Sequence, residues 1–298
     1  MDAMSVRARI AVLLTASAVA LAGCGSDSAD DTTPTSGSTK HHGQHSDEAS
    51  PSESSEPAAD QVTVPVYFVG DTPQGPRLYR EFRKVDAADP LGEALTLAAS
   101  GDALDADYRT LLPAGTFAGG TTDETAAIPL PDDSWTRAPE GMSTDDALLA
   151  VQQLVYTAQG VLQERIPVAF TDSDGNSTQI FGIASEDAFT AADPVETLAL
   201  VSVTSPEEGA TVSGSFTASG VSSSFEANTP WQIRQGDEVV ETGFATAEGW
   251  MDKLYPWETE VDVSGLEPGD YTFVAMTDDP SDGEGGGPTE DSKTITVE

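Results

Sequence analysis

The chain has 298 residues and is strongly acidic, with 51 Asp and Glu against 13 Lys and Arg and a formal net charge of −38. This balance excludes a nucleic-acid-binding protein and a polybasic hold on anionic lipid, since both depend on clustered Lys and Arg. The length suits one large domain or two of ordinary size.

The N-terminus has the pattern of a secretory signal. Arg7 and Arg9 precede an apolar run from Ile10 to Leu21, which is shorter than the roughly 20 residues of a spanning helix. The run ends in Leu21-Ala22-Gly23-Cys24, which resembles the bacterial lipobox, and Cys24 is the only Cys in the chain. The resemblance implies a lipoprotein signal peptide over residues 1–23 and a diacylglycerol on Cys24. We therefore expect a protein lipid-anchored to the cell membrane on its extracytoplasmic side, with an ordinary secreted protein as the alternative.

Residues 24–60 are predicted to be a disordered acidic linker. From Gly25 on they contain no aromatic and no branched aliphatic residue, so they cannot bury enough apolar area to offset the entropy cost of ordering. All three His of the chain, at 41, 42 and 45, lie here. A weak transition-metal site is the alternative to a plain tether. The rest of the chain has neither His nor Cys, which excludes Ser-His-Asp and Cys-His catalysis and His- or Cys-ligated zinc there.

Residues 61–193 are predicted to fold as an α+β domain. Val62–Val69 and Arg77–Val85 are rich in β-branched, aromatic or alternating residues and favour two strands. Pro167–Thr171 and Gln179–Gly182 predict a hairpin later in the domain. Between the two pairs of strands we expect two helices.

Both helices have clear start signals. Asp89 is a good N-cap for the first helix, and Gly101 is suited to its end. Ser143 begins the second, with Asp146 three residues later in a capping-box arrangement. The apolar residues that follow each cap recur at helical spacing.

Residues 197–298 are predicted to form an all-β immunoglobulin-like sandwich. Short apolar stretches recur with turn residues between them and without helical periodicity. The expected strands are Leu198–Val203, Thr211–Ser219, Phe225–Asn228, Trp231–Arg234, Val239–Ala245, Trp257–Val263, Tyr271–Met276 and Lys293–Val297. Trp231, Tyr271 and Phe273 are expected in the core. For the aromatics near loops, core packing and ligand binding both stay open: Trp250, Tyr255 and Trp257.

Several motifs resemble the GerMN domain, named from a spore germination lipoprotein, in their order and spacing. They are Val64-Pro65-Val66-Tyr67-Phe68, Leu91-Gly92-Glu93-Ala94-Leu95, Leu112-Pro113-Ala114-Gly115-Thr116 and Gln153-Leu154-Val155-Tyr156-Thr157. Thr204–Gly209, Ser213–Phe216, Phe225–Asn228, Gly265–Tyr271 and Ser281–Gly283 resemble the immunoglobulin-like domain of bacterial spore germination proteins. The chain departs from the GerMN pattern between Phe117 and Ile128, where Gly, Thr and acidic residues replace an expected apolar strand. The resemblance implies a non-catalytic envelope protein that self-associates or docks with envelope proteins.

Cys24 is the one site residue that we predict, and we expect no catalytic, cofactor-binding or metal-binding residue. Asp172–Asn176 shares the first three ligand spacings of an EF-hand but departs later, with Ile183 at position twelve. Turn geometry is the alternative reason for these residues, and Asp278–Glu284 is weighed in the same way. Two roles are open for Gln152 and Gln153: they flank the buried apolar stripe of their helix, or they bind a ligand. A paired-carboxylate glycosidase has no specific support in so acidic a chain.

These observations predict a lipid-anchored, non-catalytic cell-envelope scaffold or adaptor with germination-type domains. Its expected partners are envelope proteins or further copies of itself, and the membrane through the lipid. The alternative is a module that binds cell-wall glycan or peptide, with peptidoglycan as the partner and calcium as an aid.

Overall fold

A long antiparallel hairpin is the first element of the described residues. The computed structural model describes residues 60–298 apart from 185–186, 280–282 and 285, so Cys24 lies outside the described residues. Strands β1 (Gln61–Thr72) and β2 (Gly75–Asp86) pair along their whole length. Gly75 closes the turn with a φ of 105°, a backbone conformation that favours glycine.

The two faces of the hairpin have different surroundings. One face carries Val66 and Phe68, fully buried against the helices, with Tyr79 opposite Phe68. The other face carries Tyr67 and, directly across from it, Arg80. This alternation follows from the period of two in a strand. The Tyr67 face also carries the buried Val69 and Leu78, and the Tyr67 ring packs against Tyr156 at 5.4 Å.

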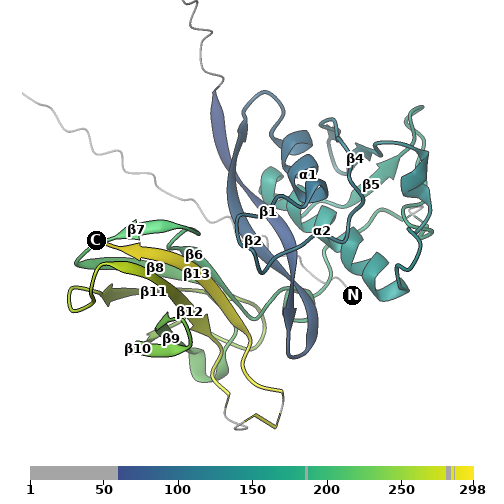
Figure 1. Cartoon of the computed structure of the whole chain (residues 1–298). Coiled ribbons are helices and arrows are strands. Elements are labelled where there is room, and N and C mark those ends of the chain that lie inside the picture. Colours follow the sequence, from purple (N-terminus) through teal and green to yellow (C-terminus); the bar gives the residue numbers. More distant parts are fainter. Residues whose placement is uncertain (1–59, 185–186, 280–282, 285) are drawn as a thin grey trace, which may run out of the picture. The chain divides into compact units, whose positions relative to one another are not determined.

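Helices α1 (Pro90–Ser100) and α2 (Thr144–Leu162) pack beside this hairpin (Figure 1). The predicted caps are confirmed. The Asp89 side chain accepts a hydrogen bond from the Gly92 amide, and Gly101 ends α1 in the left-handed conformation. Ser143 and Asp146 form the reciprocal capping box of α2.

A small sheet completes the first half of the described residues, which corresponds to the predicted α+β domain. Strands β3 (Thr121–Thr122), β4 (Ala126–Pro129) and β5 (Val168–Thr171) form it, with β4 and β5 parallel. A 3₁₀ helix, η1, spans Asp133–Thr136, and the short helix α3 spans Pro194–Thr197.

The predicted strand Gln179–Gly182 is wrong. The chain pairs across the acidic turn through the Thr171–Ser177 bridge and a hydrogen bond from the Thr178 amide to the Phe170 carbonyl. Pairing goes no further, because Phe181 has a φ of 51°, which breaks an extended path. The Phe181 and Gly182 amides donate instead to the carbonyls of Trp135 and Thr136 in η1. Tertiary hydrogen bonds therefore replace the predicted hairpin.

The second half is all-β, as predicted, and has its own hydrophobic core. One sheet has the strand order β10-β9-β12-β13-β7 and the other β11-β8-β6. The strands are β6 (Val201–Ser205), β7 (Ala210–Val212), β8 (Ser215–Ser222), β9 (Asn228–Gln235), β10 (Glu238–Thr246), β11 (Tyr255–Asp262), β12 (Gly269–Met276) and β13 (Glu290–Val297). The predicted domain boundaries at residues 60–61 and 193–197 stay predictions.

The aromatic residues of this half differ in how deeply they are buried. Trp231, Tyr271 and Phe273 are buried as expected, and Trp257 joins the core. Tyr255 is half-buried and packs against it. Trp250 is partly exposed, and its ring lies edge-on to Phe225 at 5.2 Å.

The predicted strand Phe225–Asn228 is wrong, because Phe225–Ala227 form the 3₁₀ helix η2. Glu226 and Ala227 have φ of 52° and 62°, which turns the chain before β9 begins. Within the described residues, no helix is both long and apolar enough to cross a membrane.

Candidate functional site

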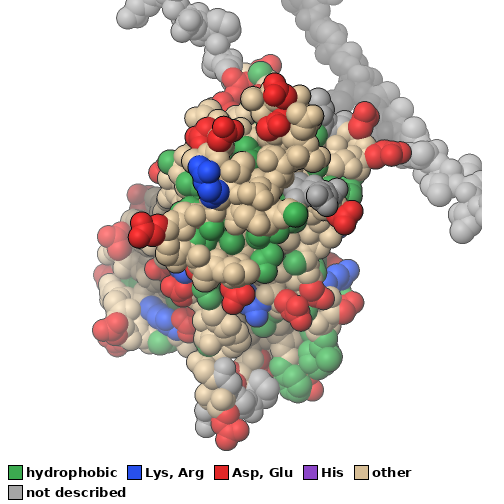
Figure 2. Space-filling view, turned by 90° about the vertical axis from the view of Figure 1, so that its right-hand side faces the viewer, with side chains coloured by type: hydrophobic (Ala, Val, Ile, Leu, Met, Phe, Trp, Pro, Cys, Tyr) green, Lys and Arg blue, Asp and Glu red, His purple; other side chains and the backbone are tan. Residues whose placement is uncertain are grey.

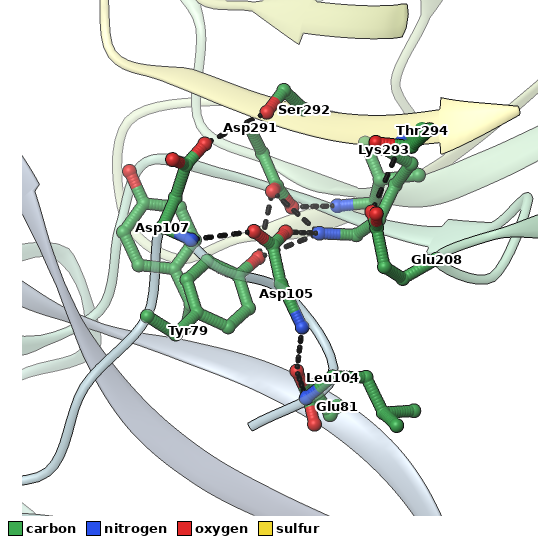
Figure 3. Close-up of polar contacts among 12 residues, drawn as sticks. Tyr79, Glu81, Leu104, Asp105, Asp107, Glu208, Asp291, Ser292, Lys293 and Thr294 are labelled. Carbon is green, nitrogen blue, oxygen red and sulfur yellow. Dashed lines mark hydrogen bonds and ion pairs between the residues drawn. The ribbon is translucent and has the colours of Figure 1, made fainter. Parts of the chain in front are cut away.

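A buried cluster of charged side chains joins the two halves of the unit (Figure 3). At its centre is Lys293 on β13, with 5% of its side chain exposed. The ammonium donates to Asp105 Oδ2 at 2.5 Å, to Asp291 Oδ1 at 2.8 Å and to Tyr108 Oη at 2.8 Å. Asp105 and Tyr108 come from the loop after α1, so residues more than 180 positions apart in the sequence meet here.

The alternation of side chains along β13 explains how the second half contributes to the cluster. Asp291 and Lys293 lie on the same face of β13 as the buried Ile295 and Val297. Asp291 also accepts a hydrogen bond from the backbone amide of Val203 on β6, at 2.5 Å. Its carboxylate is therefore held by both sheets of the second half.

The first half fixes its loop through Glu81 on β2. Glu81 Oε1 accepts from the amides of Leu104 and Asp105 at 2.8 and 2.9 Å, and Oε2 pairs with Arg83 at 3.2 Å. These bonds hold the Asp105 side chain toward Lys293.

Further hydrogen bonds cross the junction around the cluster. Tyr79 Oη donates to the Glu290 carbonyl at 2.9 Å, and its ring stacks on Tyr108 at 4.9 Å. Ser292 Oγ donates to Asp107 Oδ2 at 3.0 Å. Both halves thus contribute donors and acceptors to one connected network.

Burial and charge set the protonation states in this network. Burial alone would lower the pKa of Lys293, but Asp291 and Asp105 outweigh it and raise that pKa above 10.5. Burial raises the pKa of Asp291, and Lys293 opposes the shift. Burial, together with the two carboxylates, also raises the pKa of Tyr108 well above 10.0. At neutral pH, Lys293 is therefore a cation and Tyr108 a neutral donor.

This arrangement stabilises the junction and leaves no room for a substrate at the ammonium. The Lys293 ammonium has three partners, and the cavity that Lys293 and Asp105 line has a volume of about 30 Å³. A larger cavity of about 490 Å³ lies beside the cluster, where Asp71, Asp107 and Glu290 contribute negative charge and Arg234 is paired with Glu290. The geometry fits a rigid connection between the two halves.

The acidic turn at Asp172–Asn176 does not support the calcium alternative. Asp172 Oδ1 accepts from the amides of Asp174 and Asn176, both at 2.9 Å, so it shapes its own turn. Across the described residues, no group of three His, Cys, Asp or Glu side chains is placed to hold a metal ion. Part of the other acidic loop, Asp278–Glu284, lies outside the described residues.

Gln152 and Gln153 have packing roles. Gln153 is fully buried and donates to the Ala98 carbonyl at 3.3 Å and to Thr110 Oγ1 at 3.1 Å. Gln152 bonds to the backbone of Thr190 and Ala192. Both amides tie α2 to neighbouring segments.

Sequence reasoning missed the three charged residues of the cluster. A signal was present in β13, where Asp291 and Lys293 continue the inward positions of Ile295 and Val297. The pattern placed two charges on a buried face. It gave no indication that Asp105 would meet them.

Comparisons with known proteins agree with the division of the chain into two halves. Residues 65–179 match the family model for sporulation and spore germination, and residues 200–284 match that for the immunoglobulin-like domain of bacterial spore germination. Each half of the chain is thus similar to one of these two domain families. We call the halves the germination domain and the immunoglobulin-like domain. The families support a germination-related role.

One solved structure, tandem GerMN domains of the sporulation protein GerM from Bacillus subtilis, is similar at 13% sequence identity with a TM-score of 0.34. The similarity covers 68% of this chain and 62% of that one. No curated protein matches the chain.

Proposed function

We propose that the protein is a lipid-anchored, non-catalytic scaffold or adaptor that docks envelope proteins at the extracytoplasmic face of the cell membrane. The observation that carries the proposal is the Lys293 cluster, because it joins two domains of germination-type families through buried ion pairs. A protein that holds partners in a fixed arrangement needs such a rigid connection. Cys24 after the apolar run supports the lipid anchor.

A non-catalytic role is consistent with the distribution of reactive side chains. All three His lie at 41, 42 and 45, and the only Cys is Cys24. Both domains therefore lack the His and Cys that Ser-His-Asp and Cys-His mechanisms require. The domain families are not known as enzyme families.

The lipid anchor is tested by Cys24→Ser. We expect the wild-type protein in the membrane fraction and the variant in the soluble fraction, because two or more acyl chains are needed for durable attachment. The far-ultraviolet circular dichroism of the two should agree. A Cys24→Ser protein that stays fully in the membrane fraction would contradict the anchor.

The docking role is tested by crosslinking in intact cells. The full chain should crosslink to the same envelope protein, or to a second copy of itself, in repeated experiments. Loss of that crosslink in Lys293→Met, with the two domains still folded, would link docking to the fixed junction. A chain that crosslinks to nothing in the envelope would overturn the proposal.

A further inference from the structure

A second feature of the junction is a groove on the Tyr67 face of the hairpin. Its central cavity has a volume of about 200 Å³. We define the basic groove by six of its lining residues: Tyr67, Arg80, Tyr156, Arg165, Ser202 and Lys253. The first four belong to the germination domain, and the last two to the immunoglobulin-like domain. Leu78, Leu198 and Val221 add apolar walls.

The groove concentrates positive charge in a protein that has little of it. Acidic side chains outnumber basic ones on the face drawn in Figure 2, and the whole chain has a net charge of −38. Yet Arg80, Arg165 and Lys253 line one cavity, and within the described part of the chain none of them forms an ion pair. Arg83, Arg109, Arg234 and Lys293 are each paired with a carboxylate. Among the described residues Arg77, Lys84 and Arg137 form no ion pair either, so the groove is distinguished by having three unpaired cations on one cavity.

The basic side chains are partly held in place by neutral groups. Arg80 donates to Thr204 Oγ1 at 3.1 Å and lies over the Phe82 ring at 4.7 Å. Lys253 lies over the Tyr255 ring at 4.7 Å. These contacts orient the cations without neutralising them, which leaves their charge available to a ligand.

Two further cavities extend the groove. A cavity of about 180 Å³ shares Tyr67, Tyr156 and Arg165 with the centre, and one of about 600 Å³ shares Arg80 and Val221 with it. Because they share lining residues with the centre, the three cavities adjoin one another, and we call them together the track. Its centre is basic, whereas Glu164 lines one of the two added cavities and Glu248 and Glu258 line the other. The central volume is smaller than the roughly 300–1,000 Å³ of a drug-sized pocket, so an extended chain fits better than a compact small molecule.

Unpartnered polar atoms gather along this track. Among the described residues, five buried side-chain polar atoms have no hydrogen-bond partner, and four of them belong to residues that line the track. They are Arg80 Nε, Ser202 Oγ, Gln159 Oε1 and Trp257 Nε1. Ser202, Gln159 and Trp257 are only 3%, 7% and 3% exposed. A buried polar group without a partner costs about 1–3 kcal/mol, so each of these four atoms is stabilised by a partner, whether a ligand group or water.

We propose that the basic groove binds an extended acidic peptide segment of an envelope protein, with carboxylates on Arg80, Arg165 and Lys253 and apolar side chains against Leu78 and Val221. A peptide supplies every group that the track lacks. Its carboxylates and carbonyls accept from the arginine, serine and tryptophan donors. Its backbone N–H donates to Gln159 Oε1. A phosphate polymer would use the cations but would leave that acceptor and the apolar walls unused.

The surrounding charge adds selectivity to this binding. An acidic segment is attracted at the centre of the groove, where Arg80, Arg165 and Lys253 gather, and is repelled where carboxylates dominate the surface. Binding away from that centre is therefore disfavoured. The inference deepens the proposed docking function, on which its choice of an envelope protein rests. Peptide binding at the groove can be measured separately from membrane attachment and crosslinking.

The test uses the full chain purified in detergent, with ¹⁵N-labelled tryptophan. The probe is a synthetic peptide of alternating Glu and Leu, and its matched control has Gln in place of every Glu. We expect the Glu peptide to shift the indole N–H signal of Trp257 and to leave that of Trp231, the unpartnered indole outside the track, unchanged. The Gln peptide should bind at least about tenfold more weakly, the size expected for hydrogen bonds to charged groups.

The variant pair is R165Q with K253Q, because both side chains are exposed and their loss leaves the cores intact. R137Q with K84Q is the matched control, since it removes one exposed Arg and one exposed Lys outside the groove. The first double variant should weaken binding of the Glu peptide about tenfold or more, and the control double variant should weaken it less than about twofold. Equal losses in both pairs, or equal affinity for both peptides, would overturn the proposal.

Two other outcomes would also overturn it. If polyphosphate shifts the Trp257 signal and displaces the peptide at lower concentration, the groove is a polyanion site. If no probe moves that signal, water meets the unpartnered atoms and the groove has no peptide ligand. Neither result depends on whether the protein crosslinks to an envelope partner.

Discussion

At the scale of single residues, Lys293 should be the most costly side chain to remove. Lys293→Met leaves Asp105 and Asp291 buried without their cation, and breaking a buried ion pair in this way costs about 3–5 kcal/mol. The measurement is the free energy of unfolding in urea. Lys84→Met, at an exposed position of β2, should change it by less than about 0.5 kcal/mol. Similar losses in the two variants would show that the cluster contributes little.

The buried phenols and Lys293 predict a loss of stability at alkaline pH. Burial raises the pKa of Tyr108 well above 10.0 and that of Tyr156 to about 12. Above about pH 10 the unfolded chain therefore releases phenolic protons that the folded chain keeps, and stability falls as pH rises. The raised pKa of Lys293 acts in the same direction, since its contribution is fully present below 10.5 and is lost through its higher folded pKa.

Urea unfolding from about pH 8 to about pH 11 measures this effect. The free energy of unfolding should show little contribution from these groups up to about pH 10 and should fall beyond it. Tyr108→Phe should reduce the slope above pH 10, because one titrating group is removed. A stability that stays constant to about pH 11 would contradict the burial of these groups.

At the scale of elements, the caps of α1 and α2 should differ in what they contribute. Ser143→Ala removes one side of a capping box and should cost about 1 kcal/mol. Asp89→Ala should cost more, since Asp89 also accepts from the Gly119 amide at 2.8 Å and so holds the loop before β3. Urea unfolding ranks the two variants. Ser213→Ala, at an exposed position between β7 and β8, is the control, and an equal cost for the two caps would contradict the added role of Asp89.

The elements that the sequence predicted well are those fixed by local chemistry. Asp89, Gly101 and Ser143 act within one turn of their own helices, so the sequence alone locates them. The wrong strand at Gln179–Gly182 has β-type residues, but its amides bond to η1, which lies more than 40 positions earlier. Such pairing depends on the tertiary fold and has no local signal.

The candidate site was hidden for the same reason. Asp105 lies in an acidic loop that is typical of a solvated surface, and Lys293 lies in a strand that was predicted only as part of a sandwich. Their contact spans 188 positions. The basic groove is likewise assembled from distant segments, and only the scarcity of Lys and Arg in the sequence made each one notable.

At the scale of the whole molecule, the two domains should unfold together. Each has its own hydrophobic core, so each has a basis for independent stability. The junction couples them, because separating the domains would leave Asp105, Asp291 and Lys293 without their partners. The described residues of both domains accordingly belong to one compact unit.

Urea unfolding followed in both cores tests this coupling. Trp135 reports on the germination domain and Trp231 on the immunoglobulin-like domain, and their indole N–H signals should disappear with the same midpoint. In Lys293→Met the midpoints should separate, since the buried carboxylates then repel each other across the junction. Lys84→Met should keep a single midpoint. Two midpoints in the wild-type chain would mean that the ion pairs do not join the domains. The proposal of a scaffold would then lose the rigid connection on which it rests.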